Sequence, residues 1–486
     1  MNVVIRADAS AAIGSGHVMR CLCLADVLHA GGASVQFASR ALPDHLVQPI
    51  VQRGHRVVAL PDRTGWDERL DAEQTLSACG PCDWIVVDHY ALGVTWETAV
   101  GAAGRLLAID DLARSHVCAT LVDQNFHPDP EQRYAGRVPG DCRLLLGPHY
   151  ALLRPEFTQA RRDAEPRDGE VRRLLVFLGG MDAGNVTETV LRSIDLLDRI
   201  DLAVDVVIGA AHPARARIEA LCASRPAARC HVETTRFAAL LAEADLAIGA
   251  GGSATWERCA VGVPTMSLCL ADNQREVLFH GSRRGFVYAP DVDFNDASLL
   301  ALHLRALLAN SGLRHHLSRT GLDLVDAGGT HRVAATMLAP DIAIRRATRA
   351  DARDIHVWRN APTVRAMSGN SAPIAYAEHK KWLEGVLNSQ SRHLLIGERD
   401  GVPIGVVRFD TRDDAAEISI YLAPGRIGQG EGTALLLAAE EWLRREQPAI
   451  PTLQAQVRAG NPASHRLFER CGYEHKSTQY TKRIGA

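Results

Sequence analysis

The stretch NVVIRADASAAIGSGHVMRC, residues 2–21, joins an apolar run to a glycine turn and the start of a helix. The apolar run predicts a buried strand, and helical periodicity begins at His17 and continues to a pair of glycines. Gly14 and Gly16 allow a sharp turn between the two elements. A histidine at this position lies at the carboxyl edge of a parallel sheet, where α/β proteins bind ligands, so His17 is a candidate general base. A histidine that only caps the helix or binds an anion fits the same pattern.

Two further glycine loops follow strand-like runs later in the chain, FLGGMDAGN at 177–185 and GAGGSATWE at 249–257. Amides and hydroxyls of such loops can hold a diphosphate. The predicted substrate-binding residues are Gly180, Asp182, Gly252 and Ser253, with Glu257 one helical turn further on to bind ribose hydroxyls. The alternative is that these glycines allow only close packing of helix on sheet.

Polar residues also follow other predicted strands. Asp8 is a candidate to orient His17 or to bind a sugar, although a cap at the strand end fits it equally well. Further candidates are Tyr90 in the site and Arg20, Asn273 and Gln274 as substrate-binding residues. Four more polar side chains follow predicted strands: Asp88, His89, Asp110 and Asp111. Such a group could indicate a metal site, but carboxylates at strand ends usually cap turns.

Length and composition describe an ordinary globular chain of several domains. The 486 residues are 47% hydrophobic and 23% charged, with a formal net charge of −3. We therefore expect no nucleic-acid partner, no membrane span and no signal peptide. Eleven cysteines in apolar surroundings favour a reducing cytoplasm, and Cys79-Gly-Pro-Cys82 reads as a loop with two unpaired thiols.

Strand and helix patterns divide the chain into three predicted domains. Strands alternate with helices over 1–155 and again over 170–335, which predicts two Rossmann-like α/β domains with parallel sheets and a cleft between them. A charged linker or exposed helix lies between them at 155–172. Residues 341–486 change to antiparallel strands with few helices, including a hairpin around Asp400-Gly401, which predicts an α+β domain.

The last domain also begins a helix with a glycine turn, RIGQGEGTALLLAAEEW at 426–442. Amides of this turn could wrap a pyrophosphate; they belong to Gln429, Gly430, Glu431, Gly432 and Thr433. Glu417, at the start of the strand-like EISIYLAP, is a candidate to accept a proton from an amine, although an exposed strand carboxylate fits it somewhat better.

Residues 1–335 resemble known sugar-nucleotide enzymes. GAGGSATWERCAVGVPTMSLCLADNQ, 249–274, is similar to the nucleotide-binding stretch of GT-B glycosyltransferases, especially the MurG-like branch. RADASAAIGSGHVMRC, VVDHY, IDD, DQN and FLGGMD together resemble the UDP-sugar hydrolases of pseudaminic acid biosynthesis. The resemblance implies a GT-B fold, His17 as catalytic base, no metal requirement, and hydrolysis of UDP-2,4-diacetamido-2,4,6-trideoxy-β-L-altropyranose to UDP and the free sugar.

Residues 341–486 resemble the GNAT N-acetyltransferase superfamily through the glycine turn and GNPASHRLFERCGYE at 460–474. The resemblance implies acetyl-CoA as co-substrate, with Asn461 and Ser464 among its contacts. Two positions depart from the superfamily pattern: Ile427 stands where Gln or Arg is usual, and Phe468 replaces a tyrosine that often serves as general acid.

Together the two resemblances predict a cytoplasmic bifunctional enzyme acting on a small UDP-sugar. The C-terminal domain would acetylate the 4-amine of a UDP-linked amino sugar, and the N-terminal domains would then release UDP. One alternative is a UDP-sugar glycosyltransferase fused to an acetyltransferase of unrelated substrate. A nucleotide-sugar sensor without turnover is a second.

Overall fold

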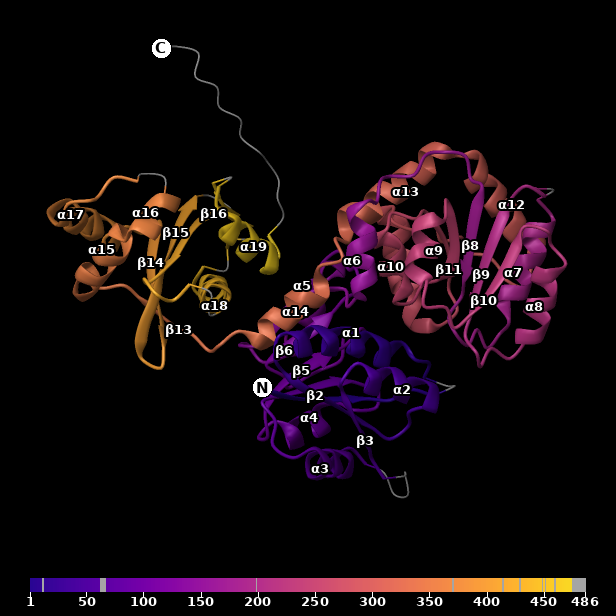
Figure 1. The fold of residues 1–486 in the computed structure, drawn as a ribbon, viewed down its shortest axis with the longest axis horizontal. Coiled ribbons are helices and arrows are strands. Elements are labelled where there is room, and N and C mark those ends of the chain that lie inside the picture. The colour runs from indigo at the N-terminus through magenta and orange to yellow at the C-terminus, as the bar shows by residue number, and fades with distance from the viewer. Residues whose placement is uncertain are drawn as a thin grey trace, which may run out of the picture. The chain divides into compact units, whose positions relative to one another are not determined.

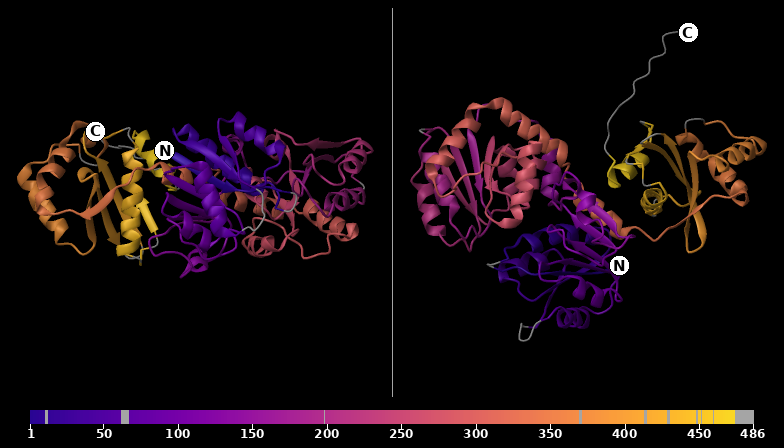
Figure 2. Two further views of the ribbon diagram at one scale, coloured as in Figure 1. Left: turned by 90° about the horizontal axis from the view of Figure 1, so that it is seen from below. Right: turned by 180° about the vertical axis from the view of Figure 1, so that it is seen from behind.

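The computed structural model describes residues 1–10, 13–61, 67–197, 199–368, 371–412, 415–427, 430–447, 449–450, 452–458 and 460–473. The chain separates into two compact units, Met1–Val333 and Ala334–Ala486, which are drawn in Figures 1 and 2. Within the described residues, we find no helix with the length and apolar character needed to cross a membrane. All eleven cysteines are free thiols.

The first half of unit 1 is a seven-stranded parallel sheet in the order β3-β2-β1-β4-β5-β6-β7. Its strands are short apolar runs; the central ones are buried on both faces, whereas the edge strands β3 and β7 are partly exposed. The strands are β1 Asn2–Ala7, β2 Ser34–Ser39, β3 Arg56–Ala59, β4 Trp84–Asp88, β5 Arg105–Ile109, β6 Thr120–Asp123 and β7 Arg143–Leu146. The helices are α1 Gly16–Ala30, α2 Asp44–Gln52, α3 Glu68–Cys79, α4 Val94–Val100 and α5 Pro130–Tyr134.

The second half of unit 1 is a five-stranded parallel sheet in the order β10-β9-β8-β11-β12. Leu174 and Val176 of β8 pack on one face with α7, α8 and α12, whereas Leu175 packs on the other with α9 and α10 (Figure 1). The strands are β8 Arg173–Phe177, β9 Ala203–Ile208, β10 Ala228–Val232, β11 Leu246–Ala250 and β12 Thr265–Leu268.

The remaining helices of unit 1 surround this second sheet or connect the two halves. They are η1 Pro148–Tyr150, α6 Pro155–Arg162, α7 Val186–Asp195, α8 Arg215–Ala223, α9 Phe237–Glu243, α10 Ala254–Ala260, η2 Asp272–Gln274, α11 Arg275–Arg284, α12 Ala297–Ala309 and α13 Ser311–Leu324. Helix α14, Gly329–Leu338, runs across the boundary between the two units.

Unit 2 is a mixed five-stranded sheet in the order β13-β14-β15-β16-β17. Helix α18 packs on one face, and α15 and α17 pack on the other. The strands are β13 Ala343–Arg346, β14 Arg392–Arg399, β15 Val402–Arg412, β16 Ala415–Leu422 and β17 Thr452–Ala455. The helices are η3 Arg349–Asp351, α15 Ala352–Asn360, α16 Pro362–Met367, α17 Tyr376–Leu387, α18 Glu431–Glu446 and α19 Pro462–Arg470.

One feature of the unit 2 sheet is an opening between its last two strands. β17 pairs with β16 in parallel only as far as Ile418 and Ala455, and β16 continues to Leu422 beyond that pair. Among the described residues, β17 therefore pairs with no residue of β16 beyond Ile418. The hairpin predicted around Asp400-Gly401 is present, with φ of 52° and 75° at its two turn residues.

The predicted fold class is confirmed: two parallel α/β sheets are followed by an α+β domain. One detail is wrong: the last domain is not poor in helices, because α15, α16, α17, α18 and α19 all belong to it. The charged stretch 155–172 begins with the helix α6. Phe157 of this helix is fully buried against the second sheet, whereas its neighbours in the sequence are polar.

Candidate functional site

His17 lies in the first turn of α1, directly after the glycine turn. Gly14 has φ of 78°, a left-handed conformation that glycine adopts without strain. The imidazole is 7% exposed, and its Nδ1 lies 2.5 Å from Oδ1 of Asp88, the last residue of β4. This contact fixes the ring and, when Nδ1 carries the hydrogen, leaves Nε2 as the proton-accepting atom.

Arg20 shares the Asp88 carboxylate with His17. Its Nε and Nη2 donate to the two oxygens of Asp88 at 2.5 and 2.6 Å, and its Nη1 lies 3.6 Å from Asp111. Burial alone would raise the pKa of Asp88, but the charges of Arg20 and His17 hold it below its usual value. The carboxylate therefore stays ionised beside the imidazole. The structure gives Arg20 this positioning contact, whereas the sequence suggested a substrate contact.

Tyr90 connects the histidine to the second half of unit 1. Its ring meets His17 edge-on at 4.7 Å between centroids, and its hydroxyl donates to Asp111 at 3.2 Å. The side-chain amide of Asn273 donates to the same hydroxyl at 3.2 Å. Burial raises the pKa of Tyr90, and the Asp111 charge adds to this, so the phenol stays protonated. Three residues predicted for the site, His17, Tyr90 and Asn273, are thus brought together.

The loop at 251–254 faces the start of α1. A Cβ built on Gly16 would lie 4.0 Å from Oγ of Ser253, which is exposed. The amides of Gly252, Ser253 and Ala254 have no acceptor among the described residues. Gln274 shapes the loop, because its Oε1 accepts from the amide of Gly251 at 3.2 Å. The loop therefore offers hydroxyl and amide donors next to His17.

Glu257 lies on α10 and pairs with Arg154 through Oε1 at 3.1 Å. Burial raises the pKa of Glu257, and Arg154 opposes that shift. A ribose contact by Glu257 stays a prediction, and it would share the carboxylate with Arg154.

One expectation needs correction. Asp8 does not orient His17, because its oxygens bind Arg6 at 2.7 and 3.0 Å and lie beside His89. Both oxygens of Asp182 cap α7, accepting from the amides of residues 186 and 187, and the carbonyl of Gly180 accepts from Gly209 at 3.0 Å. A sugar contact by Asp8 and substrate contacts by Asp182 and Gly180 stay predictions.

Asp88 is the functional residue that sequence reasoning missed. Carboxylates at strand ends usually cap turns, and Asp110 does accept backbone and side-chain bonds from Arg114. No local signal distinguishes Asp88; the parallel pairing of β1 with β4 in the folded chain places it beside the helix that follows β1.

In unit 2, α18 begins directly after Gly430, whose φ is 76°. Thr433 and Ala434 donate to the carbonyl of Gly430, and the amides of Glu431 and Gly432 have no acceptor among the described residues. The Glu431 side chain is fully buried and holds Arg426 at 3.1 Å and Arg399 at 3.3 Å. Gln429 lies outside the described residues.

The other residues predicted for unit 2 lie on α19 and β16. Asn461 caps α19, accepting from the amide of Ser464 at 3.1 Å and donating to its hydroxyl at 2.9 Å. Glu417 is half-buried and lies one residue before the last β16–β17 pair, Ile418 with Ala455. Their roles toward acetyl-CoA and the amine stay predictions.

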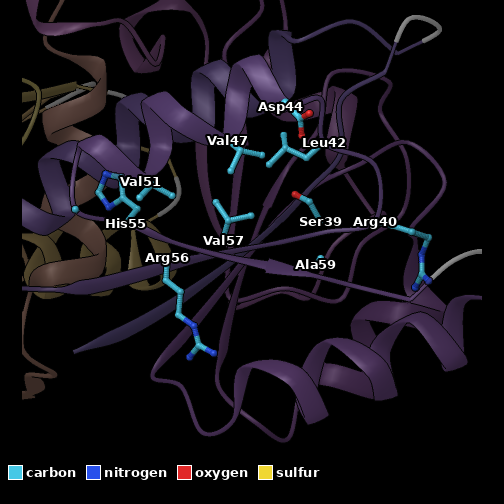
Figure 3. Close-up of a pocket in the computed structure, with 11 residues that line it drawn as sticks. Ser39, Arg40, Leu42, Asp44, Val47, Val51, His55, Arg56, Val57 and Ala59 are labelled. Atoms are coloured by element: carbon cyan, nitrogen blue, oxygen red, sulfur yellow. The ribbon is translucent and has the colours of Figure 1, made fainter.

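A cavity of about 690 Å³ lies elsewhere, between α2 and the edge strand β3 (Figure 3). Val47, Val51 and Val57 point into it, and Arg40 and His55 lie at its two ends. None of the predicted site residues lines this cavity, so we assign it no part in the proposed reactions.

Comparison with known proteins finds a family match for the last part of the chain. Residues 341–474 match the family described as Acetyltransferase (GNAT) domain, so the chain carries an acetyltransferase domain after its two parallel sheets. Spore coat polysaccharide biosynthesis protein SpsG of Bacillus subtilis is 29% identical over 204 residues, which are 41% of this chain. The chain spans 59% of the length of that relative.

Two further similarities each cover more than half of the chain. The UDP-2,4-diacetamido-2,4,6-trideoxy-β-L-altropyranose hydrolase of Campylobacter jejuni is 23% identical over 289 residues, covering 59% of this chain and 98% of the relative. The crystal structure of MurG from Acinetobacter baumannii is 14% identical, with a TM-score of 0.49, and covers 69% of this chain and 99% of MurG.

Proposed function

We propose that the chain is a bifunctional enzyme of sugar-nucleotide metabolism. Unit 2 transfers an acetyl group from acetyl-CoA to the 4-amine of a UDP-linked amino sugar. Unit 1 then hydrolyses the resulting UDP-2,4-diacetamido-2,4,6-trideoxy-β-L-altropyranose to UDP and the free sugar, as in pseudaminic acid biosynthesis. The observation that carries the hydrolase proposal is His17 held by Asp88 and facing the open amides of residues 252–254.

The chemistry of unit 1 follows from these groups. Nδ1 of His17 donates to Asp88, so Nε2 accepts a proton from water as the water oxygen bonds to the anomeric carbon. The bond from that carbon to the diphosphate oxygen breaks, and UDP leaves with the electron pair. Amides and the hydroxyl at 252–254 stabilise the negative charge that grows on the diphosphate. Tyr90 and Asn273 hold the two halves of the site together.

The chemistry of unit 2 follows from the start of α18 and the opening beside β16. The amides of Glu431 and Gly432 would bind the pyrophosphate of acetyl-CoA, next to Arg426 and Arg399. Backbone groups at 419–422, which β17 leaves unpaired, would hold the pantetheine arm and thioester carbonyl. The sugar amine attacks the thioester carbon, the carbon–sulfur bond breaks, and CoA leaves as the thiolate with the electron pair. The nitrogen gives one proton to Glu417, the candidate acceptor, and the thiolate takes up a proton from water to become the thiol.

A single incubation tests the proposed order. The intact chain receives the UDP-4-amino sugar with or without acetyl-CoA, and NMR follows UDP and both sugars. We expect little UDP without acetyl-CoA, because a charged amine would leave the polar groups meant for an acetamide unpaired. Acetyl-CoA should start UDP release after a lag. Rapid release without it contradicts the order, and release that requires an added sugar acceptor would instead favour a glycosyltransferase.

The role of His17 is tested separately. His17→Asn should lower UDP release on the order of a hundredfold or more, as expected when a general base is lost, and should leave acetyl transfer unchanged. His29→Asn, at the other end of α1, is the matched control. Near-wild-type hydrolysis by His17→Asn would reject the assignment.

A further inference from the structure

Three metal-binding side chains meet where the two halves of unit 1 join, outside the groups used above. His127 follows β6 in the first half, and Glu276 and His280 lie one turn apart on α11 in the second. Their ligand atoms all lie within 4.8 Å of one another. Residues four apart on a helix share one face, so Glu276 and His280 present their side chains together.

The His127 ring has the orientation of a metal ligand. Its side chain is 7% exposed; Nδ1 lies 3.5 Å from Oε1 of Glu276, and Nε2 lies 3.6 Å from Oδ2 of Asp123. Nε2 has no hydrogen-bond partner in the described part of the chain. Histidines that bind metals commonly present the second ring nitrogen to a carboxylate. Asp123 is placed for that role.

Arg133 is the competing partner at this position. Its Nη1 lies 2.8 and 2.7 Å from the two oxygens of Glu276. A carboxylate has about four lone-pair sites, so Glu276 can accept from Arg133 and still coordinate an ion. The guanidinium charge would nevertheless weaken cation binding. Replacing Arg133 should therefore strengthen zinc binding, whereas replacing a ligand should weaken it.

We propose that His127, Glu276 and His280 form a zinc site that ties the two halves of unit 1 together. Two imidazoles and one carboxylate are a donor set that zinc favours, with water in the fourth position. The ion would fix α11, and with it Asn273, which lies three residues before Glu276 and contacts Tyr90. Its role is structural, because the ion takes no part in the bonds that are made and broken.

The test uses the intact chain after treatment with a chelator. Zn²⁺ alone is titrated by calorimetry, and Co²⁺ is titrated by visible absorption, in which thiolate ligands give a distinct charge-transfer band. We expect one site without thiolate ligation and a rise in the melting temperature of unit 1 on zinc addition. His280→Ala and His127→Gln should each weaken binding at least tenfold, a loss typical of a removed ligand or its partner.

Two further variants make the outcome decisive. His45→Ala, an exposed histidine of α2, should bind zinc like the wild type. Arg133→Met should bind zinc more tightly, because it removes the competing charge. If the cluster is only an ion pair between Arg133 and Glu276, this variant should lose the pair and gain no zinc affinity. Equal binding by His280→Ala and His45→Ala, thiolate-ligated cobalt, or no binding even by Arg133→Met would overturn the proposal.

Discussion

At the scale of the residue, the arrangement around His17 depends on one carboxylate. Asp88 accepts from His17 and from two nitrogens of Arg20, and the sulfur of Cys21 lies 3.6 Å away. Burial of all these groups means that the ionised Asp88 has little water to share its charge. The carboxylate therefore holds the imidazole in place from one side and leaves its other nitrogen free for the reaction.

We predict that Asp88→Asn lowers UDP release on the order of a hundredfold, because the neutral amide no longer stabilises the imidazolium that forms. The pH–rate profile should change shape as well, which a purely structural role would not cause. Asp26→Asn is the control, since Asp26, which lies on α1, also pairs with a histidine, His55, at 2.9 Å. Wild-type rate and pH profile in Asp88→Asn would contradict the prediction.

At the scale of the element, the segments that follow β5 are held by a buried charge cluster. His116 places Nδ1 2.6 Å from Glu97 of α4 and Nε2 3.5 Å from Asp110. Burial alone would lower the pKa of His116, but these two carboxylates raise it to about 9. The protonated ring joins α4 to the loop that carries Asp111 and so supports the site indirectly.

The raised pKa of His116 predicts how the free energy of unfolding changes with pH. Below about 6.5, the ordinary value, the ring is protonated in both folded and unfolded chains, and its stabilising contribution is complete. Between 6.5 and about 9 the unfolded chain loses the proton first, so the contribution decreases and is lost above 9. Urea unfolding of unit 1 from pH 6 to 9.5 measures this. His116→Gln should remove most of the slope between pH 7 and 9, and an unchanged slope would contradict it.

A second prediction concerns the turn before α18. A Cβ on Gly430 meets open space, but its φ of 76° costs other residues roughly 1–2 kcal/mol. Gly430→Ala adds only this strain, whereas Gly430→Asp adds a negative charge where a pyrophosphate should bind. We expect Gly430→Asp to raise the KM for acetyl-CoA well beyond the effect of Gly430→Ala, with hydrolysis of the diacetylated substrate unchanged. Equal KM values would remove this turn from the cofactor site.

At the scale of the whole molecule, each unit has its own hydrophobic core. Unit 1 contains clusters on both faces of its second sheet, and unit 2 packs α18 and α15–α17 on its own sheet. Helix α14 crosses the boundary, but its first turns bind unit 1: Thr330 donates to the carbonyl of Leu153 at 2.8 Å, and Arg332 donates to that of His149 at 2.7 Å. A cut should therefore follow Leu338.

We predict that fragments 1–338 and 341–486 fold independently and keep one activity each, because each includes a complete core. Circular dichroism and separate assays of UDP release and acetyl transfer measure this. A matched cut after residue 328, which removes α14, should destabilise the first fragment because Val333 and Met337 are buried. Loss of both activities in the 1–338 and 341–486 pair would show that the units depend on one another.

The sequence by itself determined the architecture and the candidate histidine. Apolar runs of four to six residues between helical patterns specify parallel strands, and glycine turns before helices mark where their carboxyl edges lie. These are local signals, so they identified His17, the loop around Ser253 and the turn at Gly430.

Only the tertiary structure decided which polar groups meet. Asp8 and Asp88 both follow buried strands, and nothing local separates them, yet Asp8 pairs with Arg6 while Asp88 holds His17. The difference arises because β1 lies beside β4 in the sheet, so the carboxyl end of β4 meets α1. The contacts of Tyr90 with Asn273, and of His127 with Glu276, likewise join residues more than 140 positions apart. Such contacts depend on how the two sheets of unit 1 pack, which no short stretch of sequence encodes.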